Sequence, residues 1–189
     1  MMVVSERDDN GVTLVELIVF IVVAGLFGSL LVLMFVNGIS EQSRSTVRDD
    51  ATGKANVISV SLSHLRNATH ATASPDGTAL IATIVSRTGV ESCYGWSIPG
   101  DGTVRYLADS STPIRFADVA GGGVLVEVDA DNGDVLTGDF TSTGDSVLAD
   151  ISITSRDETS GAVTTVPLSL TIPTQAILET EAMSQCVSP

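Results

Sequence analysis

A single carboxylate, that of Glu16, lies at the start of an apolar run from Leu17 to Val36 that contains no charged residue. A charge at the centre of a bilayer costs at least about 2.5–3.5 kcal/mol on insertion scales, and it costs less near the edge. Such a charge is tolerated mainly when it is paired. The chemistry that Glu16 could perform is therefore neutralisation of a positive charge in an apolar environment, and its carboxylate needs a cationic partner.

Cleavage of the chain after Gly11 would supply that partner, because it would create a new α-amino group at Val12. The amine would lie about one helical turn from Glu16, so that in a packed array each carboxylate could neutralise the amine of a neighbour. A second interpretation needs no cleavage, since a glutamate in the first turn of a helix is stabilised by the helix dipole. The residues alone leave both interpretations open.

The apolar run itself predicts a membrane-spanning helix. Its 20 residues rise about 30 Å, which is the thickness of one hydrocarbon core. Backbone polar groups in that core must be paired within the segment, so helix is the expected form. Gly25, Gly28 and Ser29 would let neighbouring helices approach closely, although glycine is also common in membrane helices generally. The run exceeds the core of a cleaved secretory signal, so we expect it to be retained.

The segment 11–16, Gly-Val-Thr-Leu-Val-Glu, resembles the class III signal of type IV prepilins and type II secretion pseudopilins. The resemblance extends to about Val36. It implies that a membrane prepilin peptidase cleaves between Gly11 and Val12 and methylates the new terminus at Val12. It also implies that Glu16 sets the axial register of the helix when subunits assemble.

Two features depart from the pattern of this family. Val12 stands where phenylalanine or methionine is usual, and the leader, residues 1–11, is acidic where a basic leader is usual. A second, looser similarity links segment 65–68, Tyr94 and segment 105–107 to the minor pilins and J-type pseudopilins. It rests on a few common residue types and shifts the expected subtype only slightly.

The distribution of basic residues near the run conflicts with the topology that the resemblance implies. Arg7 precedes the run, whereas Arg44, Arg48 and Lys54 follow it, which by the positive-inside rule places the C-terminal side in the cytoplasm. Long domains, however, translocate largely regardless of charge. We therefore expect a single-pass plasma-membrane protein whose C-terminal head lies outside the cytoplasm, with a cell-surface filament as a further destination.

The rest of the chain predicts an α+β fold of four parts: leader 1–11, membrane and assembly helix 12–36, amphipathic helical extension 37–72 and β-rich head 73–189. An apolar stripe at spacings of four and three residues places one face of the extension against the head; it comprises Ala51, Ala55, Ile58, Leu62 and Leu65. An interruption at Asn37-Gly38 is the alternative.

Short β-branched segments after residue 78 predict antiparallel strands. They are Ala79–Ser86, Cys93–Ile98, Thr103–Ala108, Val124–Asp129, Ser146–Ser155 and Val163–Ile172. Turns are predicted at residues 74–77, 98–103 and 131–134, where proline, glycine, aspartate and asparagine gather.

The only two cysteines, Cys93 and Cys186, predict a disulfide outside the cytoplasm. Closing so long a loop is worth up to about 4–5 kcal/mol in the chain-entropy model. The alternative is a pair of buried or unpaired thiols.

No cofactor or metal site is expected. Asp129, Asp131 and Asp134 do not fit a calcium loop, because Phe140 occupies the twelfth position where glutamate is required. His64 and His70 lie six residues apart, on different helical faces, with no further ligand at zinc spacing.

The charge of the head argues against nucleic-acid binding by the isolated head. Residues 73–189 carry 16 Asp and Glu and four Lys and Arg, a net charge of −12, whereas phosphate contacts need basic side chains. No nucleophile, base and metal ligand come together, so an enzyme is not expected.

The function that we expect is that of a minor pilin or pseudopilin, assembled through its N-terminal helix into a type IV pilus or type II secretion-like filament. Its expected partners are the prepilin peptidase, other pilin or pseudopilin subunits and the membrane assembly platform. The alternative is a single-pass anchored β domain that binds a surface ligand without forming a filament.

Overall fold

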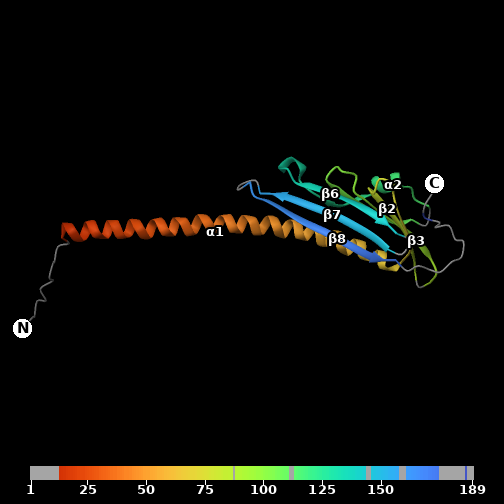
Figure 1. The fold of residues 1–189 in the computed structure, drawn as a ribbon, viewed down its shortest axis with the longest axis horizontal. Helices are drawn as coiled ribbons and strands as arrows, with labels where there is room; N and C mark the ends of the chain where they lie inside the picture. The colour runs from red at the N-terminus through yellow and green to blue at the C-terminus, as the bar shows by residue number, and fades with distance from the viewer. Residues whose placement is uncertain are drawn as a thin grey trace, which may run out of the picture. The chain divides into compact units, whose positions relative to one another are not determined.

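The computed structural model describes residues 13–86, 88–110, 113–143, 146–157, 161–174 and 186. It confirms an α+β architecture, in which a long N-terminal helix precedes antiparallel strands (Figure 1). The chain divides into two compact units, residues 1–42 and residues 43–189. The predicted leader, residues 1–11, and Val12 lie outside the described residues.

The helices are α1 (Leu14–Leu62), α2 (Phe116–Ala120) and the short 3-10 helices η1 (Ser63–Asn67) and η2 (Ala130–Asn132). The strands are β1 (Ala68–Ala73), β2 (Ala79–Val85), β3 (Glu91–Ser97), β4 (Thr103–Ser110), β5 (Gly123–Glu127), β6 (Val135–Ser142), β7 (Ser146–Arg156) and β8 (Val163–Pro173).

Helix α1 continues through Asn37 and Gly38, so the alternative of two helices broken there is wrong. Its serine hydroxyls are satisfied within the helix, since Ser29 Oγ donates to the Leu26 carbonyl at 2.8 Å and Ser40 Oγ to the Val36 carbonyl at 3.1 Å. These local bonds remove the cost of placing a hydroxyl in apolar surroundings.

The predicted apolar stripe is confirmed as the helix face that packs in the second unit. Each of its members is buried, and all join one core with residues of both sheets: Ala51, Ala55, Ile58, Leu62 and Leu65. Thr52 and Gly53, which lie between stripe members, and Arg66, which follows Leu65, are exposed. A helix with this spacing turns one continuous face to the core, as the sequence predicts.

The predicted helical extension to residue 72 is wrong in its last part. The α-helix ends at Leu62, η1 reaches Asn67, and residues 68–73 form β1. β1 pairs antiparallel with β2, with Ala73 opposite Leu80. Pairing with the backbone of β2 and the β-branched side chains of Thr69 and Thr72 favour a strand here over a further helical turn.

The strands form two antiparallel sheets, one of order β1-β2-β3-β4-β5 and one of order β6-β7-β8. Six predicted strands are confirmed to within a few residues, whereas β1 and β6 were not predicted. All three predicted turns are present, with left-handed backbone at Gly77, Gly100 and Gly133 among others. In β7 alternate side chains are buried, from Val147 to Ser155, as expected for a strand with one face on the core.

Trp96 anchors the contact between the helix and the larger sheet. It is fully buried, and its Nε1 donates to Ser61 Oγ on α1 at 2.8 Å. The ring of Tyr106 lies 5.4 Å away between centroids, and that of Tyr94 6.4 Å away. His64, which is exposed at the helix end, lies parallel to Tyr94 at 6.3 Å. The hydrogen bond satisfies the one polar atom of a buried indole.

A second, smaller core contains Ile81, Cys93, Ile114, Val119 and Cys186. Helix α2 reaches it because Gly95 in β3 lets Val119 lie directly on the strand. A Cβ added at Gly95 would stand 2.5 and 2.8 Å from the Val119 methyl carbons. The glycine is therefore required by close packing of α2 on β3.

Substitution Gly95→Ala is expected to destabilise the second unit by about 1–3 kcal/mol, the usual cost of overpacking a core. The measurement is the denaturant midpoint of the full-length protein in detergent micelles. Gly53→Ala is the matched control, because an added Cβ meets nothing within 4 Å there and alanine favours helix. An unchanged midpoint for Gly95→Ala would contradict the close packing.

Candidate assembly site

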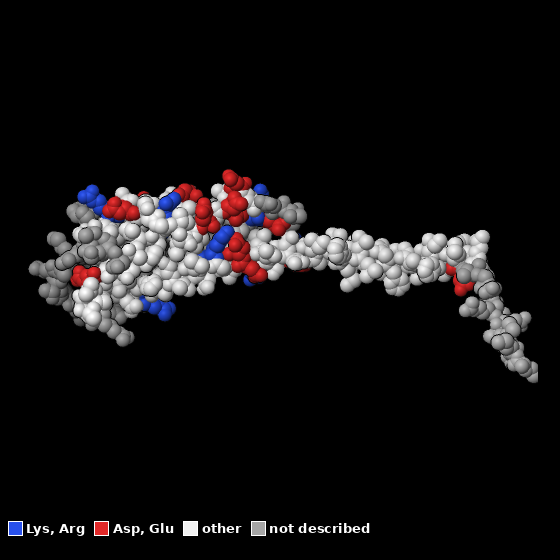
Figure 2. Space-filling model, turned by 180° about the vertical axis from the view of Figure 1, so that it is seen from behind, with Lys and Arg blue, Asp and Glu red and all other residues white. Residues whose placement is uncertain are grey.

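The first unit presents an apolar surface that no other described residue covers. Its large apolar side chains from Leu14 to Val36 are between 44% and 75% exposed. Within the described residues, one helix is long and apolar enough to cross a membrane, and it contains this segment. On the face that Figure 2 shows, the middle of this helical segment carries no charged side chain. Water is a poor solvent for such a surface, so lipid or other helices must cover it.

Glu16 lies in the first turn of α1, at the end of this apolar surface. Its backbone N–H donates to Thr13 Oγ1 at 3.3 Å, and the Leu17 N–H donates to the Thr13 carbonyl at 3.1 Å. Thr13 therefore caps the helix. The Glu16 carboxylate makes no ion pair with any described residue of the chain. The site thus offers an unpaired acid where the helix dipole favours an anion.

The Thr13 cap was not predicted, although the sequence contains its signal. Thr13 and Glu16 form the pattern Thr-x-x-Glu just before an apolar run, which is typical of a helix start. The other predicted site residues, Gly11 and Val12, lie outside the described residues. The cleavage and methylation predicted for them stay predictions.

The small residues of the first unit are open to their surroundings. A Cβ added at Gly25 or Gly28 meets no atom within 4 Å. Three residues apart, the two glycines leave a shallow place on the helix where another backbone can come close.

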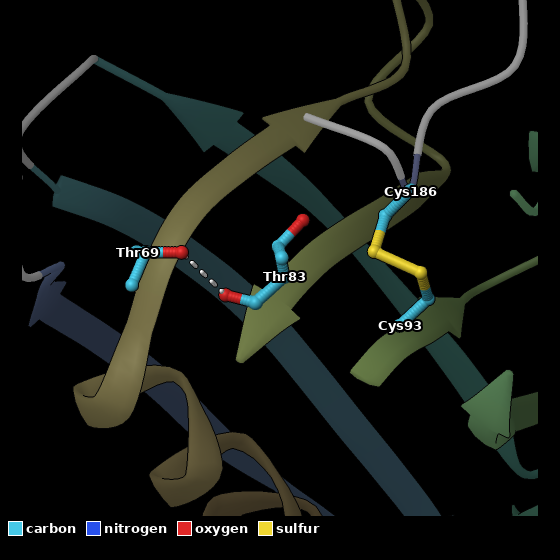
Figure 3. The surroundings of a disulfide bond; sticks show 4 residues. All are labelled: Thr69, Thr83, Cys93 and Cys186. Carbon is cyan, nitrogen blue, oxygen red and sulfur yellow. Dashed lines mark hydrogen bonds between the residues drawn. A yellow bond between two sulfur atoms is a disulfide. The ribbon is translucent and has the colours of Figure 1, made fainter. Parts of the chain in front are cut away.

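Cys93 and Cys186 form a disulfide, with their Cα atoms 5.4 Å apart, so the alternative of two unpaired thiols is wrong (Figure 3). Both residues are buried. The Cys186 carbonyl also accepts a hydrogen bond from the Ile114 N–H at 3.0 Å. The bond therefore closes the second core and attaches a residue near the C-terminus to β3.

Two of the three acidic residues considered for calcium, Asp129 and Asp134, make hydrogen bonds that hold the fold. Asp129 caps η2 by accepting from the Asn132 N–H at 3.3 Å, and Asp134 Oδ1 accepts from the Arg156 N–H at 2.7 Å. Gly133 provides the left-handed residue of the turn. In the described part of the chain, no group of three or more His, Cys, Asp or Glu residues could hold a metal ion.

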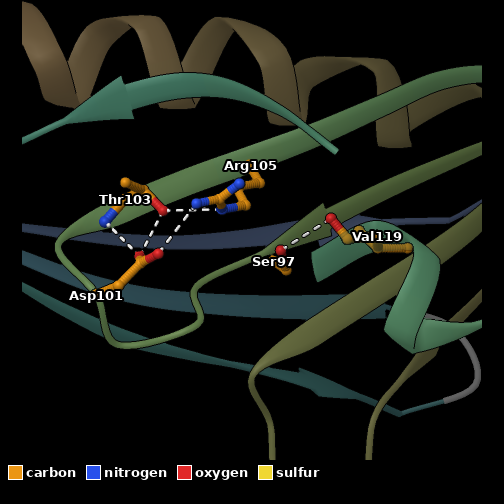
Figure 4. A network of polar contacts seen from close by, with 5 residues as sticks. All are labelled: Ser97, Asp101, Thr103, Arg105 and Val119. Atoms are coloured by element: carbon orange, nitrogen blue, oxygen red, sulfur yellow. Dashed lines mark hydrogen bonds and ion pairs between the residues drawn. The ribbon is translucent and has the colours of Figure 1, made fainter. Parts of the chain in front are cut away.

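A polar network fixes the loop between β3 and β4 (Figure 4). Asp101 Oδ1 accepts from Thr103 Oγ1 at 2.5 Å, and Asp101 Oδ2 lies 3.1 Å from Arg105 Nη2. The hydrogen bond from Thr103, followed by Arg105, lowers the pKa of Asp101 below its ordinary value. Sequence reasoning predicted this turn without its charged network.

No protein-family model, no curated protein and no solved structure matches this chain.

Proposed function

We propose that the chain is a minor pilin or pseudopilin subunit that is cleaved after Gly11 and assembles through its N-terminal helix into a filament. One observation supports this most directly. The first unit exposes apolar side chains on every side of a helix, and Glu16 in its first turn forms no ion pair with any residue that the structure describes. A lipid anchor needs the apolar surface but not the acid, whereas an array of processed helices gives the acid a partner.

The disulfide and the location of the core are compatible with such a subunit. The core of the second unit is completed by residues 51–65 and the two sheets, so the segment from Leu14 to Val36 is not needed to close it. Disulfides persist in oxidising compartments, which agrees with a head outside the cytoplasm.

Processing is expected to remove residues 1–11 and to leave a chain that begins at Val12 and carries one added methyl group. Intact-mass analysis of the protein, purified from cells that contain a prepilin peptidase, measures both changes. Gly25→Val is the matched control, since it alters the helix interior and not the cleavage position. A chain that still begins at Met1 would contradict the proposal and favour the anchored β domain.

A further inference from the structure

A groove of about 500 Å³ lies on the second unit, between α2, the turn that joins β1 to β2 and the loop after β3. Its apolar lining consists of Pro75, Ala79, Pro99, Phe116, Ala117 and Ala120. This volume is within the range of about 300–1,000 Å³ that is typical of ligand sites. None of the residues that line this groove belongs to the exposed apolar segment of the first unit.

The first wall of the groove is a turn held by several hydrogen bonds. The Ala79 N–H donates to Ser74 Oγ at 2.9 Å, and the Gly77 N–H donates to the Ser74 carbonyl at 2.9 Å. The Gly77 carbonyl accepts from the Phe140 N–H at 2.8 Å, which ties the turn to β6. The wall is therefore organised before any ligand arrives, which lowers the entropic cost of binding.

The opposite wall, α2, is held equally well. Val119 is fully buried against Gly95 in the core that the disulfide closes. Figure 4 shows that Ser97 Oγ donates to the Val119 carbonyl, at 3.2 Å. Phe116 packs against the same core and lines the groove. A five-residue helix with these attachments is a fixed part of the surface.

Among the described residues that line this groove, Asp76 is the only ionisable one. Its Oδ1 accepts from Ser74 Oγ and from the Thr78 N–H, and its Oδ2 accepts from Thr78 Oγ1 at 2.9 Å. A carboxylate has about four acceptor positions, so one remains on Oδ2. The bond from Ser74, followed by those from Thr78, lowers the pKa of Asp76, so it stays ionised in mildly acidic solution.

The described residues that line the two sides of this turn add negative charge to that of Asp76. The lining of a second hollow on the other side of the same turn includes Asp76 and Asp139, and none of the described residues that line either hollow is Lys or Arg. The whole chain has a formal net charge of −14. A fixed anion beside apolar side chains is complementary to a cation on an apolar stem.

We propose that this groove binds a basic side chain of a partner polypeptide, an arginine or lysine that is adjacent to an apolar residue. The cation pairs with Asp76 Oδ2, the methylene stem lies along Pro75 and Ala79, and the apolar neighbour contacts Pro99 and Phe116. Arginine and lysine suit the site because their stems pack on apolar surface while the charged head remains partly hydrated.

The experiment uses the full-length protein in detergent micelles, labelled with ¹³C at the alanine methyl groups. Ala79, Ala117 and Ala120 line the groove and report on it directly. The probes are the capped tripeptide Leu-Arg-Leu, the same peptide with neutral citrulline in place of arginine, and the capped tripeptide Gly-Arg-Gly. The arginine peptide is expected to shift these methyl signals saturably. Each of the other two is expected to bind at least tenfold more weakly, because each lacks one of the two contacts.

Two variants remove the site in different ways. Asp76→Asn keeps the shape of the turn residue and removes its charge, and Ala120→Arg places a cation in the groove without altering the turn. Both are expected to lower the affinity for Leu-Arg-Leu at least tenfold. The controls, Asp131→Asn and Ala108→Arg, change the same charges at exposed residues that line neither hollow, and the affinity is expected to stay within about twofold.

Four results would overturn the proposal, and the first three concern the peptides and the variants. These are the absence of a saturable shift with the arginine peptide, equal binding of the citrulline peptide, and unchanged binding after both groove substitutions. Methyl shifts that depend on protein concentration and not on peptide would assign the groove to a second copy of the chain, and would overturn it too. The outcome is independent of cleavage after Gly11.

Discussion

Replacement of Glu16 by alanine is expected to leave removal of the leader intact and to lower incorporation into a filament about 100-fold or more. Loss of one member of a buried ion pair costs about 3–5 kcal/mol, because the other charge stays in apolar surroundings without a partner. The proposed cleavage position lies five residues before Glu16, so removal of the leader is not expected to depend on the carboxylate. The measurement compares the subunit content of purified filaments with that of the membrane fraction.

Two further variants separate the charge of Glu16 from its place in the first helical turn. Glu16→Gln keeps the size of the side chain and is expected to fail as completely as alanine. Thr13→Ala removes the observed cap, costs about 1 kcal/mol and is expected to reduce incorporation less than tenfold. Normal incorporation of either Glu16 variant would rule out the pairing role. Equal failure of Thr13→Ala would assign Glu16 to helix initiation.

Removal of the disulfide is expected to destabilise the head by about 3–5 kcal/mol. Cys93 and Cys186 are 93 residues apart, so their bond greatly restricts the unfolded chain. The double variant Cys93→Ala/Cys186→Ala, unfolded by denaturant in micelles, measures this loss. Amide exchange is expected to rise first in α2 and the start of β3, which pack on the second core.

The reduced wild-type protein provides the control for this measurement. Reductant should shift the unfolding midpoint of the wild type to that of the double variant and leave the double variant unchanged. The reduction will need partial denaturation, since both sulfur-bearing residues are buried. Equal midpoints for oxidised wild type and double variant would show that the bond adds no stability.

The parts of the fold that the sequence predicted are those with strong periodicity. The stripe from Ala51 to Leu65 recurs at helical spacing, and each of its members is buried. The segment from Leu17 to Val36 needs only length and apolarity to be recognised. Both patterns are local in the sequence, so they could be recognised without knowing which residues pack against them in the fold.

The missed strands lack such a local pattern. β6 contains Gly138 and Asp139, which disfavour strands. A Cβ at Gly138 would stand 2.7 Å from the Asp150 carbonyl oxygen of β7, so the glycine is explained by a neighbour that the sequence does not reveal. β1 follows a helix whose apolar spacing does not indicate where the helix ends. Its strand conformation depends on pairing with β2, which the sequence does not reveal.

The candidate sites divide in the same way. Glu16 was predicted because an acidic residue beside an apolar run can be recognised from the sequence alone. The groove beside Asp76 was not, because it joins residues 74–79, 97–99 and 116–120 from three separate parts of the chain. Aspartate in a turn after proline is ordinary, and only the tertiary fold places apolar side chains beside it.

The uninterrupted course of α1 has a mechanical consequence. From Ala51 to Leu65 in η1, its last turns hold five buried apolar side chains along about 21 Å of helix. A pull along the axis of this part of the helix would act on the core of the second unit through one continuous element. The five contacts would then share the load in shear instead of parting one at a time.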